Sequence, residues 1–264
     1  MGVIKIFIAN DKGGVGKSLV AQFCVLALDA NGLDPDIIEY DNQPKMRSMF
    51  GADRVETNSI GLSADGNRDQ DEGVVSWDPL LENLLSNNSF VVDFGAQAWA
   101  GFSEWAESID LGQYYKGRGL SIIVPVTADR EALNGAIRVL KSARELLPAA
   151  KIHVLKVNKD GDVDDLEGIP EYKMLFTMIE TCKAKVKDLP TLRAKGLPVL
   201  FSLNYSLDRI VNTPLEDLPL GDLPMASRAR LIASVKDWLG EANKVLLSAL
   251  ISVKKVGGTR LRRR

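Results

Sequence analysis

The stretch NDKGGVGKS, residues 10–18, decides the fold. It follows the β-branched run VIKIFIA at residues 3–9, which is typical of a buried strand, and it leads into apolar residues at helical spacing between Gly16 and Ala30. Three glycines let successive backbone N–H groups turn toward one anion, and the N-terminus of a helix adds its positive dipole end. Lys17 is placed to reach the β and γ phosphates of a nucleotide, and the Ser18 hydroxyl to bind Mg²⁺. The stretch therefore predicts a phosphate-binding loop rather than a plain glycine-rich turn.

The loop departs from the usual P-loop pattern in one informative way. The strict form G-x-x-x-x-G-K-[ST] is not met, because Asp11 stands at its first glycine position. Residues 12–18 match instead the deviant form K-G-G-x-G-K-[ST], and in this the chain resembles the ParA/MinD family of P-loop ATPases. The resemblance implies a slow ATP hydrolase that dimerises when ATP binds. It also implies that the extra lysine, Lys12, reaches into the partner's active site and steadies the charge on the transferred phosphoryl group.

Two carboxylates downstream are candidates for catalysis and metal binding. The strand Asp36–Tyr40 ends beside Asp41, at the place where the family carries D-x-D-P-Q, and the resemblance makes Asp41 the residue that orients the attacking water or the Mg²⁺ shell. Glu39 replaces the first Asp of that pattern, and a simpler interpretation is two acids that end a strand. Asp93 ends the run FVVD at residues 90–93, the arrangement of a Walker B carboxylate that holds Mg²⁺ directly or through water. The following Phe94-Gly95-Ala96 lacks the family's prolines and predicts a flexible switch II.

The base of the nucleotide is expected to lie near Asn158. The stretch Val157-Asn158-Lys159-Asp160 is close to the guanine-reading N-K-x-D, but Gly161 stands where that motif needs Asp, which disfavours GTP. In ParA/MinD relatives an Asn after this strand contacts adenine, although an Asn that merely ends a strand in a turn is the other interpretation.

The resulting predicted site uses ATP and Mg²⁺ as cofactors. The residues expected in catalysis are Lys12, Lys17 and Asp41, and those expected to bind Mg²⁺ are Ser18, Asp41 and Asp93. The residues expected to bind the nucleotide are Lys12, Gly13, Gly14, Val15, Gly16, Lys17, Ser18, Leu19 and Asn158.

Short β-type runs that alternate with helical patterns predict an α/β fold, a mostly parallel twisted sheet flanked by helices. Helices are expected over Arg130–Leu147 and Ala226–Val253, the latter with an apolar stripe that packs on the sheet. The polar segment Ala52–Gly73 and the proline-containing segment Leu215–Pro224 are expected to be surface loops. We expect one domain over residues 1–256. The expected strands are Val3–Ala9, Asp36–Tyr40, Phe90–Phe94, Leu120–Val126, Lys151–Val157 and Leu197–Leu203.

Composition excludes several other classes of protein. With 45% apolar and 26% charged residues the chain has an ordinary globular composition. Its two cysteines, Cys24 and Cys182, lie far apart and suggest neither a disulfide framework nor a zinc or iron–sulfur site, and the single His153 excludes a multi-histidine metal centre. The sequence contains no run of 18 apolar residues, so it predicts no membrane span. We expect a cytoplasmic location.

The charge is distributed unevenly along the chain. Residues 254–264 contain six basic residues and no acidic one, and the rest of the chain has 27 basic against 35 acidic residues. The end of the chain, residues 257–264, is therefore expected to be a flexible basic tail. Such a tail suits non-specific contact with DNA phosphates, although a charged terminus that only aids solubility is equally simple.

The resemblance leaves three functions open. The first is an ATP-dependent dimer that binds DNA and segregates plasmids or chromosomes, associated with the nucleoid and stimulated by a ParB-like or other adaptor protein. The second is a MinD-like positioning ATPase on a membrane. It is disfavoured because only Leu261 is apolar after Gly257, too little for insertion. The third is a ParA-like ATPase that serves conjugation or secretion, which would use the same P-loop.

Overall fold

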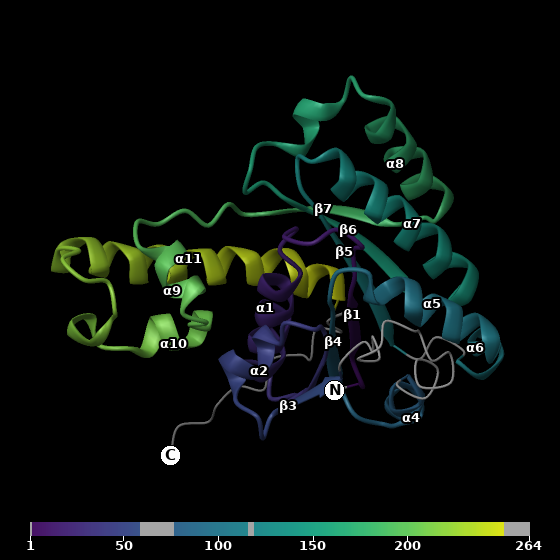
Figure 1. Ribbon diagram of the computed structural model, residues 1–264, viewed down its shortest axis with the longest axis horizontal. Helices are drawn as coiled ribbons and strands as arrows, with labels where there is room; N and C mark the ends of the chain where they lie inside the picture. Colours follow the sequence, from purple (N-terminus) through teal and green to yellow (C-terminus); the bar gives the residue numbers. More distant parts are fainter. Residues whose placement is uncertain (1, 59–76, 116–118, 251–264) are drawn as a thin grey trace, which may run out of the picture.

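A computed structural model describes residues 2–58, 77–115 and 119–250, with side chains described as far as Leu246. The strands form a seven-stranded sheet in the order β3-β2-β4-β1-β5-β6-β7, and every neighbouring pair is parallel (Figure 1). The strands are β1 (Lys5–Ile8), β2 (Asp36–Tyr40), β3 (Val55–Asn58), β4 (Phe90–Phe94), β5 (Leu120–Val126), β6 (Lys151–Val157) and β7 (Lys185–Leu189). The predicted α/β fold with a parallel sheet is confirmed.

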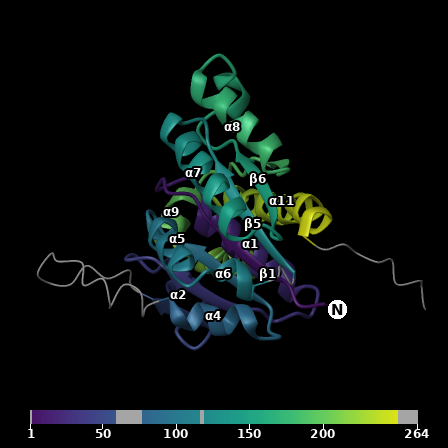
Figure 2. The same cartoon turned by 90° about the vertical axis from the view of Figure 1, so that its right-hand side faces the viewer.

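Helices cover both faces of this sheet, as buried parallel strands require. Figure 1 shows α5, α7 and α8 on one side of the strands and α1, α9 and α10 on the other, and in Figure 2 the first group is turned toward the viewer. On the first face lie α4 (Asp78–Leu85), α5 (Ala98–Ser108), α6 (Leu111–Tyr114), α7 (Arg130–Leu146) and α8 (Pro170–Thr181). On the second lie α1 (Lys17–Asp29), α2 (Lys45–Phe50), α9 (Leu197–Ser202), α10 (Leu207–Asn212) and α11 (Met225–Leu250). Short 3₁₀ turns are η1 (Val163–Leu166) and η2 (Leu215–Asp217).

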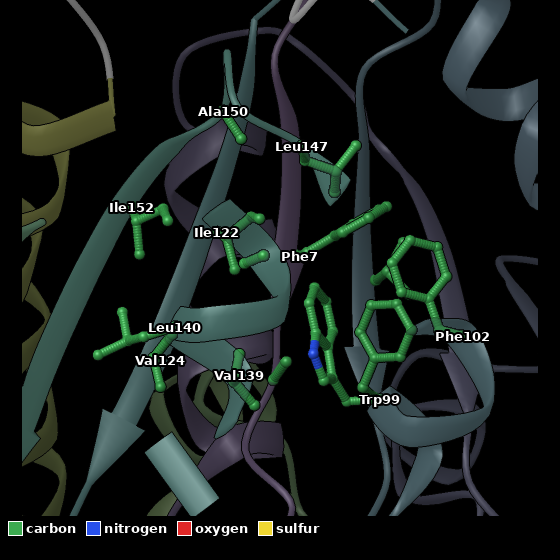
Figure 3. Close-up of a cluster of buried hydrophobic side chains, with 14 of the residues drawn as sticks. Phe7, Trp99, Phe102, Ile122, Val124, Val139, Leu140, Leu147, Ala150 and Ile152 are labelled. Carbon is green, nitrogen blue, oxygen red and sulfur yellow. The ribbon is translucent and has the colours of Figure 1, made fainter. Parts of the chain in front are cut away.

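The core consists of two apolar layers that the sheet separates. Alternate side chains of β1 enter opposite layers, Phe7 toward α5 and α7 and Ile6 and Ile8 toward α1 and α11. Figure 3 shows the first layer, where Phe7 meets Trp99 and Phe102 of α5 beside aliphatic side chains of β5 and α7. Each layer contains side chains from several neighbouring strands. A shift of one strand against the next would therefore disrupt the packing on both faces, and this holds the strand ends in register.

Two sequence-based predictions about elements are corrected, and one strand was not predicted. Leu197–Leu203 is not a strand but contains α9, which begins after Gly196 at φ +93° with Pro198 in its first turn. A short apolar run does not distinguish a strand from a buried helix by periodicity, and proline favours the first turn of a helix. The segment Ala52–Gly73 contains the edge strand β3, and its remainder, from residue 59, lies outside the described residues. The polar strand β7, KVKDL, has no strand pattern and was not predicted.

The predicted C-terminal helix is confirmed as α11, whose apolar stripe packs on α1 and β7. The predicted loop Leu215–Pro224 contains η2 and is fixed by Arg228 of α11. The Arg228 guanidinium donates to the carbonyls of Leu215 (3.0 Å), Glu216 (3.3 Å), Leu218 (3.0 Å), Gly221 (2.6 Å) and Leu223 (2.9 Å). The predicted basic tail, residues 257–264, lies outside the described residues.

The two cysteines and the single histidine are buried. Cys24 and Cys182 are buried free thiols. His153 is buried in β6, and burial together with Lys185, Lys151 and Lys187 lowers its pKa to about 4, which keeps the imidazole neutral. Among the described residues, no helix is both long and apolar enough to cross a bilayer.

Candidate nucleotide site

A cavity of about 650 Å³ lies at the carboxyl ends of the strands, the edge at which parallel α/β sheets bind ligands. The loops after β1, β2, β4, β6 and β7 all contribute to it. Its lining comprises Gly13, Gly14, Gly16, Lys17, Ser18, Leu19, Asp41, Asn42, Gln43, Lys45, Ala96, Val157, Asn158, Lys159, Leu189, Pro190, Thr191, Leu192, Arg193, Phe201 and Trp238. The structure therefore brings most of the predicted site residues to one hollow.

The loop between β1 and α1 has the geometry of an anion cradle. Gly14 has φ +78° and Gly16 has φ +92°, values that side-chain-bearing residues rarely adopt. Gly16 is the N-cap of α1, and a Cβ there would lie 3.4 Å from Val157. Val15, by contrast, is buried, so it can contribute to a ligand site only through its backbone. The predicted phosphate loop thus places a helix N-terminus at the cavity.

Asn10, a residue to which the sequence assigned no role, anchors this loop to the sheet. Its buried amide donates to the carbonyls of Pro125 in β5 (2.8 Å) and Ala132 in α7 (3.0 Å). Its Oδ1 accepts from the backbone N–H of Lys12 (2.9 Å). Gly135 of α7 leaves room for it, because a Cβ at that glycine would lie 2.3 Å from Asn10 Oδ1. The side chain thereby fixes the point at which the chain leaves β1 and turns into the loop.

Lys12 and Lys17 have different surroundings. Lys17 is buried, and its ammonium donates to the carbonyls of Asn10 (2.9 Å) and Lys12 (2.8 Å), so it lies inside the curve of the loop. Burial lowers the pKa of Lys17, and the nearby Asp93, Asp41 and Asp11 oppose that effect. Lys12 is exposed and lies outside the cavity lining. One lysine is positioned at the cradle, and the other is accessible to a second molecule.

Asp93 is a buried carboxylate beside the loop. It is 1% exposed, and within the described part of the chain neither carboxylate oxygen has a hydrogen-bond partner of normal geometry. Burial raises the pKa of Asp93 to about 7, and the neighbouring Ser18 hydroxyl and Lys17 ammonium partly offset this. An unpartnered buried carboxylate is costly, and a cation would satisfy it.

These donors fit a Mg²⁺ ion that is shared with nucleotide phosphates. Ser18 and Asp93 supply the hard oxygens that Mg²⁺ prefers, and Asp41 lines the same cavity. Within residues 2–58, 77–115 and 119–250, no set of three or more His, Cys, Asp or Glu side chains converges as a self-sufficient metal site. That arrangement suits an ion held by one or two protein groups together with phosphates and water.

The two acids at the end of β2 have separate roles. Asp41 Oδ1 accepts from the Gln43 N–H (3.0 Å), an Asx turn that orients the carboxylate at the cavity. Glu39 is fully buried, and its carboxylate accepts from the backbone N–H groups of Lys45 (2.6 Å), Met46 (2.9 Å) and Arg47 (3.3 Å). Burial raises the pKa of Glu39, and these hydrogen bonds oppose the rise. Glu39 therefore satisfies the first backbone N–H groups of α2.

The predicted switch II segment, residues 94–96, is anchored at its middle residue. Gly95 donates its N–H to the Tyr40 carbonyl (2.7 Å), and the two loops after β2 and β4 touch at this point. The contact follows from strand register, which pairs Tyr40 with Phe94, and the sequence alone does not reveal that pairing.

Residues that follow β6 and residues at and after the end of β7 also line the cavity. Asn158 lines it, and its Oδ1 accepts from the Val163 N–H (3.4 Å), so the side chain is partly engaged in its own turn. Residues 189–193 also line the cavity, although the sequence did not predict them as part of the site. Trp238 of α11 fixes them by donating to the Pro190 carbonyl (2.5 Å). No sequence motif marks the polar strand β7 or the loop that follows it.

In this parallel sheet the loop with the pattern K-G-G-x-G-K-[ST] lies between the first strand and the first helix, where a helix N-terminus can bind phosphate. No family model matches the chain. The curated protein MobD of Acidithiobacillus ferrooxidans is 27% identical to it over 243 residues, which cover 90% of this chain and 94% of MobD.

The solved structures that the chain matches include cell-division and McdA proteins. The MinC:MinD cell division protein complex of Aquifex aeolicus is 15% identical and covers 88% of this chain and 96% of its own, with a TM-score of 0.45. The complex of a Cyanothece McdA variant with ATP is 14% identical and covers 90% and 96%, with a TM-score of 0.40. The MinD cell division protein of Aquifex aeolicus is 13% identical and covers 88% and 98%, with a TM-score of 0.41.

The unpartnered Asp93 predicts a measurable stability cost. Its folded pKa of about 7 lies above the ordinary value of 3.8, so stability falls as pH rises from about 4 to about 7, and the full cost of the buried charge is present above pH 7. Asp93→Asn should stabilise the nucleotide-free protein at pH 8 by on the order of 4 kcal/mol, and by little near pH 4. Urea unfolding at both pH values measures this, with the exposed Asp237→Asn as control. A variant less stable than wild type at pH 8 would contradict the assignment.

The packing of Asn10 against α7 predicts a second effect. Gly135→Ala should displace the Asn10 side chain and weaken ATP binding by about 10-fold, because the Lys12 N–H loses its acceptor. Gly240→Ala, at another helical glycine where an added Cβ would meet no atom within 4 Å, is the matched control. Titration with a fluorescent ATP analogue measures both, and equal affinities for the two variants would show that Asn10 does not support the loop.

Proposed function

We propose that this chain is an ATPase switch that binds Mg²⁺–ATP in the cavity, dimerises and hydrolyses the nucleotide slowly. The observation that carries the proposal is the unpartnered buried carboxylate of Asp93 beside Ser18 and Lys17, at the mouth of a glycine loop. A structure without a ligand would gain stability from an apolar residue at this position. A carboxylate there is consistent with a site built for a divalent cation and phosphates.

The proposed roles follow from burial and position. The backbone of residues 13–18 and the α1 N-terminus bind the phosphates, and Lys17 neutralises their charge from inside the loop. Ser18 and Asp93 hold Mg²⁺, which when bound neutralises charge on the phosphate oxygens. Asp41, oriented by its Asx turn, positions the water that attacks the terminal phosphate. The adenine lies between Asn158 and the loop after β7.

The remaining residue with a proposed role is Lys12, which acts in the dimer. Lys12 is exposed, and its backbone N–H is held by Asn10, so its side chain is available to reach a second subunit. In the proposed dimer it neutralises charge on the partner's nucleotide as the phosphoryl group moves. Hydrolysis removes the group that both lysines bind, and the dimer then separates.

For the output of the switch we propose non-specific DNA binding in plasmid or chromosome segregation. The support is the basic end of the sequence, whose Arg260, Arg262, Arg263 and Arg264 suit phosphate contact without base reading. An activating adaptor protein would set the rate of hydrolysis. A membrane-bound, MinD-like role and a role in conjugation or secretion use the same ATP site and differ in the surface that the dimer binds.

The ATP site predicts a contrast between two variants. Lys17→Ala should abolish nucleotide binding, because the phosphates lose their buried cation. Asp41→Ala should bind ATP and dimerise but turn it over at least about 100-fold more slowly, because only the attacking water loses its partner. Calorimetry, sedimentation velocity with ATP and phosphate release measure the three properties. Normal turnover by Asp41→Ala would remove this residue from the mechanism.

The DNA-binding output predicts that removal of residues 258–264 weakens ATP-dependent binding of a non-specific duplex. Four arginines are lost, so the slope of log K against log salt should fall by about 3 to 4. An electrophoretic shift at several salt concentrations measures this. Unchanged binding would place the DNA surface on the folded body, and ATP-dependent flotation with anionic liposomes in place of a DNA shift would favour the membrane role.

A further inference from the structure

The loops that follow β2 and β4 are joined to each other at the edge of the cavity. The strands pair in parallel with Tyr40 opposite Phe94, so the next residues, Asp41 and Gly95, come together. The Gly95 N–H donates to the Tyr40 carbonyl at 2.7 Å, which extends the pairing one step beyond the strands. The loop that carries Asp41 and the loop that follows Asp93 thus meet through a backbone hydrogen bond.

Gly95 is required at this point because nothing larger fits. A Cβ there would lie 2.7 Å from Asp41 Cγ, 2.8 Å from the Tyr40 carbonyl oxygen and 3.0 Å from Asp41 Cα. Its φ is not in the left-handed region, so the constraint is close approach and not backbone conformation. Two of the three atoms belong to the backbone and do not rotate away. The side chain of Asp41 therefore packs directly against the glycine.

A stack of aromatic rings fixes both strand ends on the opposite face of the sheet. The rings of Tyr40 and Trp77 stack with centroids 4.2 Å apart, and Phe94 stacks on each of them at 5.9 Å. Phe94 also meets Phe7 edge-on at 5.2 Å and Phe102 at 5.4 Å, and those two rings belong to the layer shown in Figure 3. Packed rings of this kind resist displacement of the main chain that carries them.

We propose that Gly95 is a positioning residue for Asp41, and that the glycine contact sets the place of the Asp41 carboxylate at the cavity. The inference rests on the proposed ATPase function, because it assigns a role in water positioning. Gly95 also connects Asp41 with the proposed Mg²⁺ residue. Asp93, the proposed Mg²⁺ residue, lies two positions before Gly95, so the metal residue and the contact with Asp41 are separated only by Phe94, the last residue of β4.

The test compares two glycine-to-alanine variants, one in the loop between β4 and α5 and one within α5. Gly95→Ala forces Asp41 aside, whereas a Cβ at Gly101 of α5 would make ordinary contacts of 3.7 Å with the Trp77 ring. At saturating Mg²⁺–ATP, Gly95→Ala should lower kcat by about 100-fold with the Kd for ATP within about 3-fold of wild type. Gly101→Ala should match wild type in both. Unchanged kcat in Gly95→Ala, or a parallel loss of ATP binding and turnover, overturns the inference.

The activities of the wild type and of Gly95→Ala distinguish a failure of this inference from a failure of the proposed function. A wild-type chain that binds no ATP or shows no turnover overturns the proposed function and the role of Gly95 with it. An active wild type with an equally active Gly95→Ala overturns the role of Gly95 alone.

If Gly95→Ala does not fold, amide hydrogen exchange of the wild type decides the question. The Gly95 and Gln43 amides, which report on the two loops, should change protection together when Mg²⁺ and a non-hydrolysable ATP analogue bind. A change at one amide without the other, or at neither, overturns the inference.

Discussion

The parallel register of β2, β4 and β1 is the constraint on which the site depends. It pairs Ile8 with Asp93 and Asp93 with Glu39, so three strands that are distant in sequence end at the same level. The loop after β1, the carboxylate that ends β4 and Asp41 after β2 are thereby brought to one edge. A slip of one residue in either pairing would turn Asp93 to the other face of the sheet, among the aromatic rings. The two apolar layers prevent that slip, so the core determines the chemistry at the edge.

Polar support of the loops comes from buried side chains that reach across the sheet. Asn10 connects the phosphate loop to β5 and α7, and Glu39 holds the start of α2 through three backbone N–H groups. Both side chains are buried and satisfied, which is the usual condition for polar groups inside a protein. Asp93 is the contrast, because its oxygens face no donor of normal geometry in the described chain. The difference separates groups that shape the site from a group that is available to a ligand.

The sequence was informative where the signal is local. The phosphate loop, its flanking strand and helix, and the run that ends at Asp93 follow from short patterns, and the structure places them together. Glu39 could not be assigned from sequence, because a carboxylate that caps a helix and one that serves catalysis look alike until the chain turn is known. The apolar run at α9 and the polar β7 carry no periodicity that identifies them. Contacts such as that of Gly95 with Asp41 depend on strand register, which one sequence does not contain.

The central claim is that the glycine loop and Asp93 form one site for a nucleotide and its metal ion. A crystal structure with Mg²⁺ and a non-hydrolysable ATP analogue tests it most directly. We expect the triphosphate inside the loop, the Lys17 ammonium turned from the loop carbonyls to the phosphates, and the metal beside Ser18 and Asp93. An analogue bound elsewhere, or a loop that stays closed on Lys17 at saturating ligand, would contradict it.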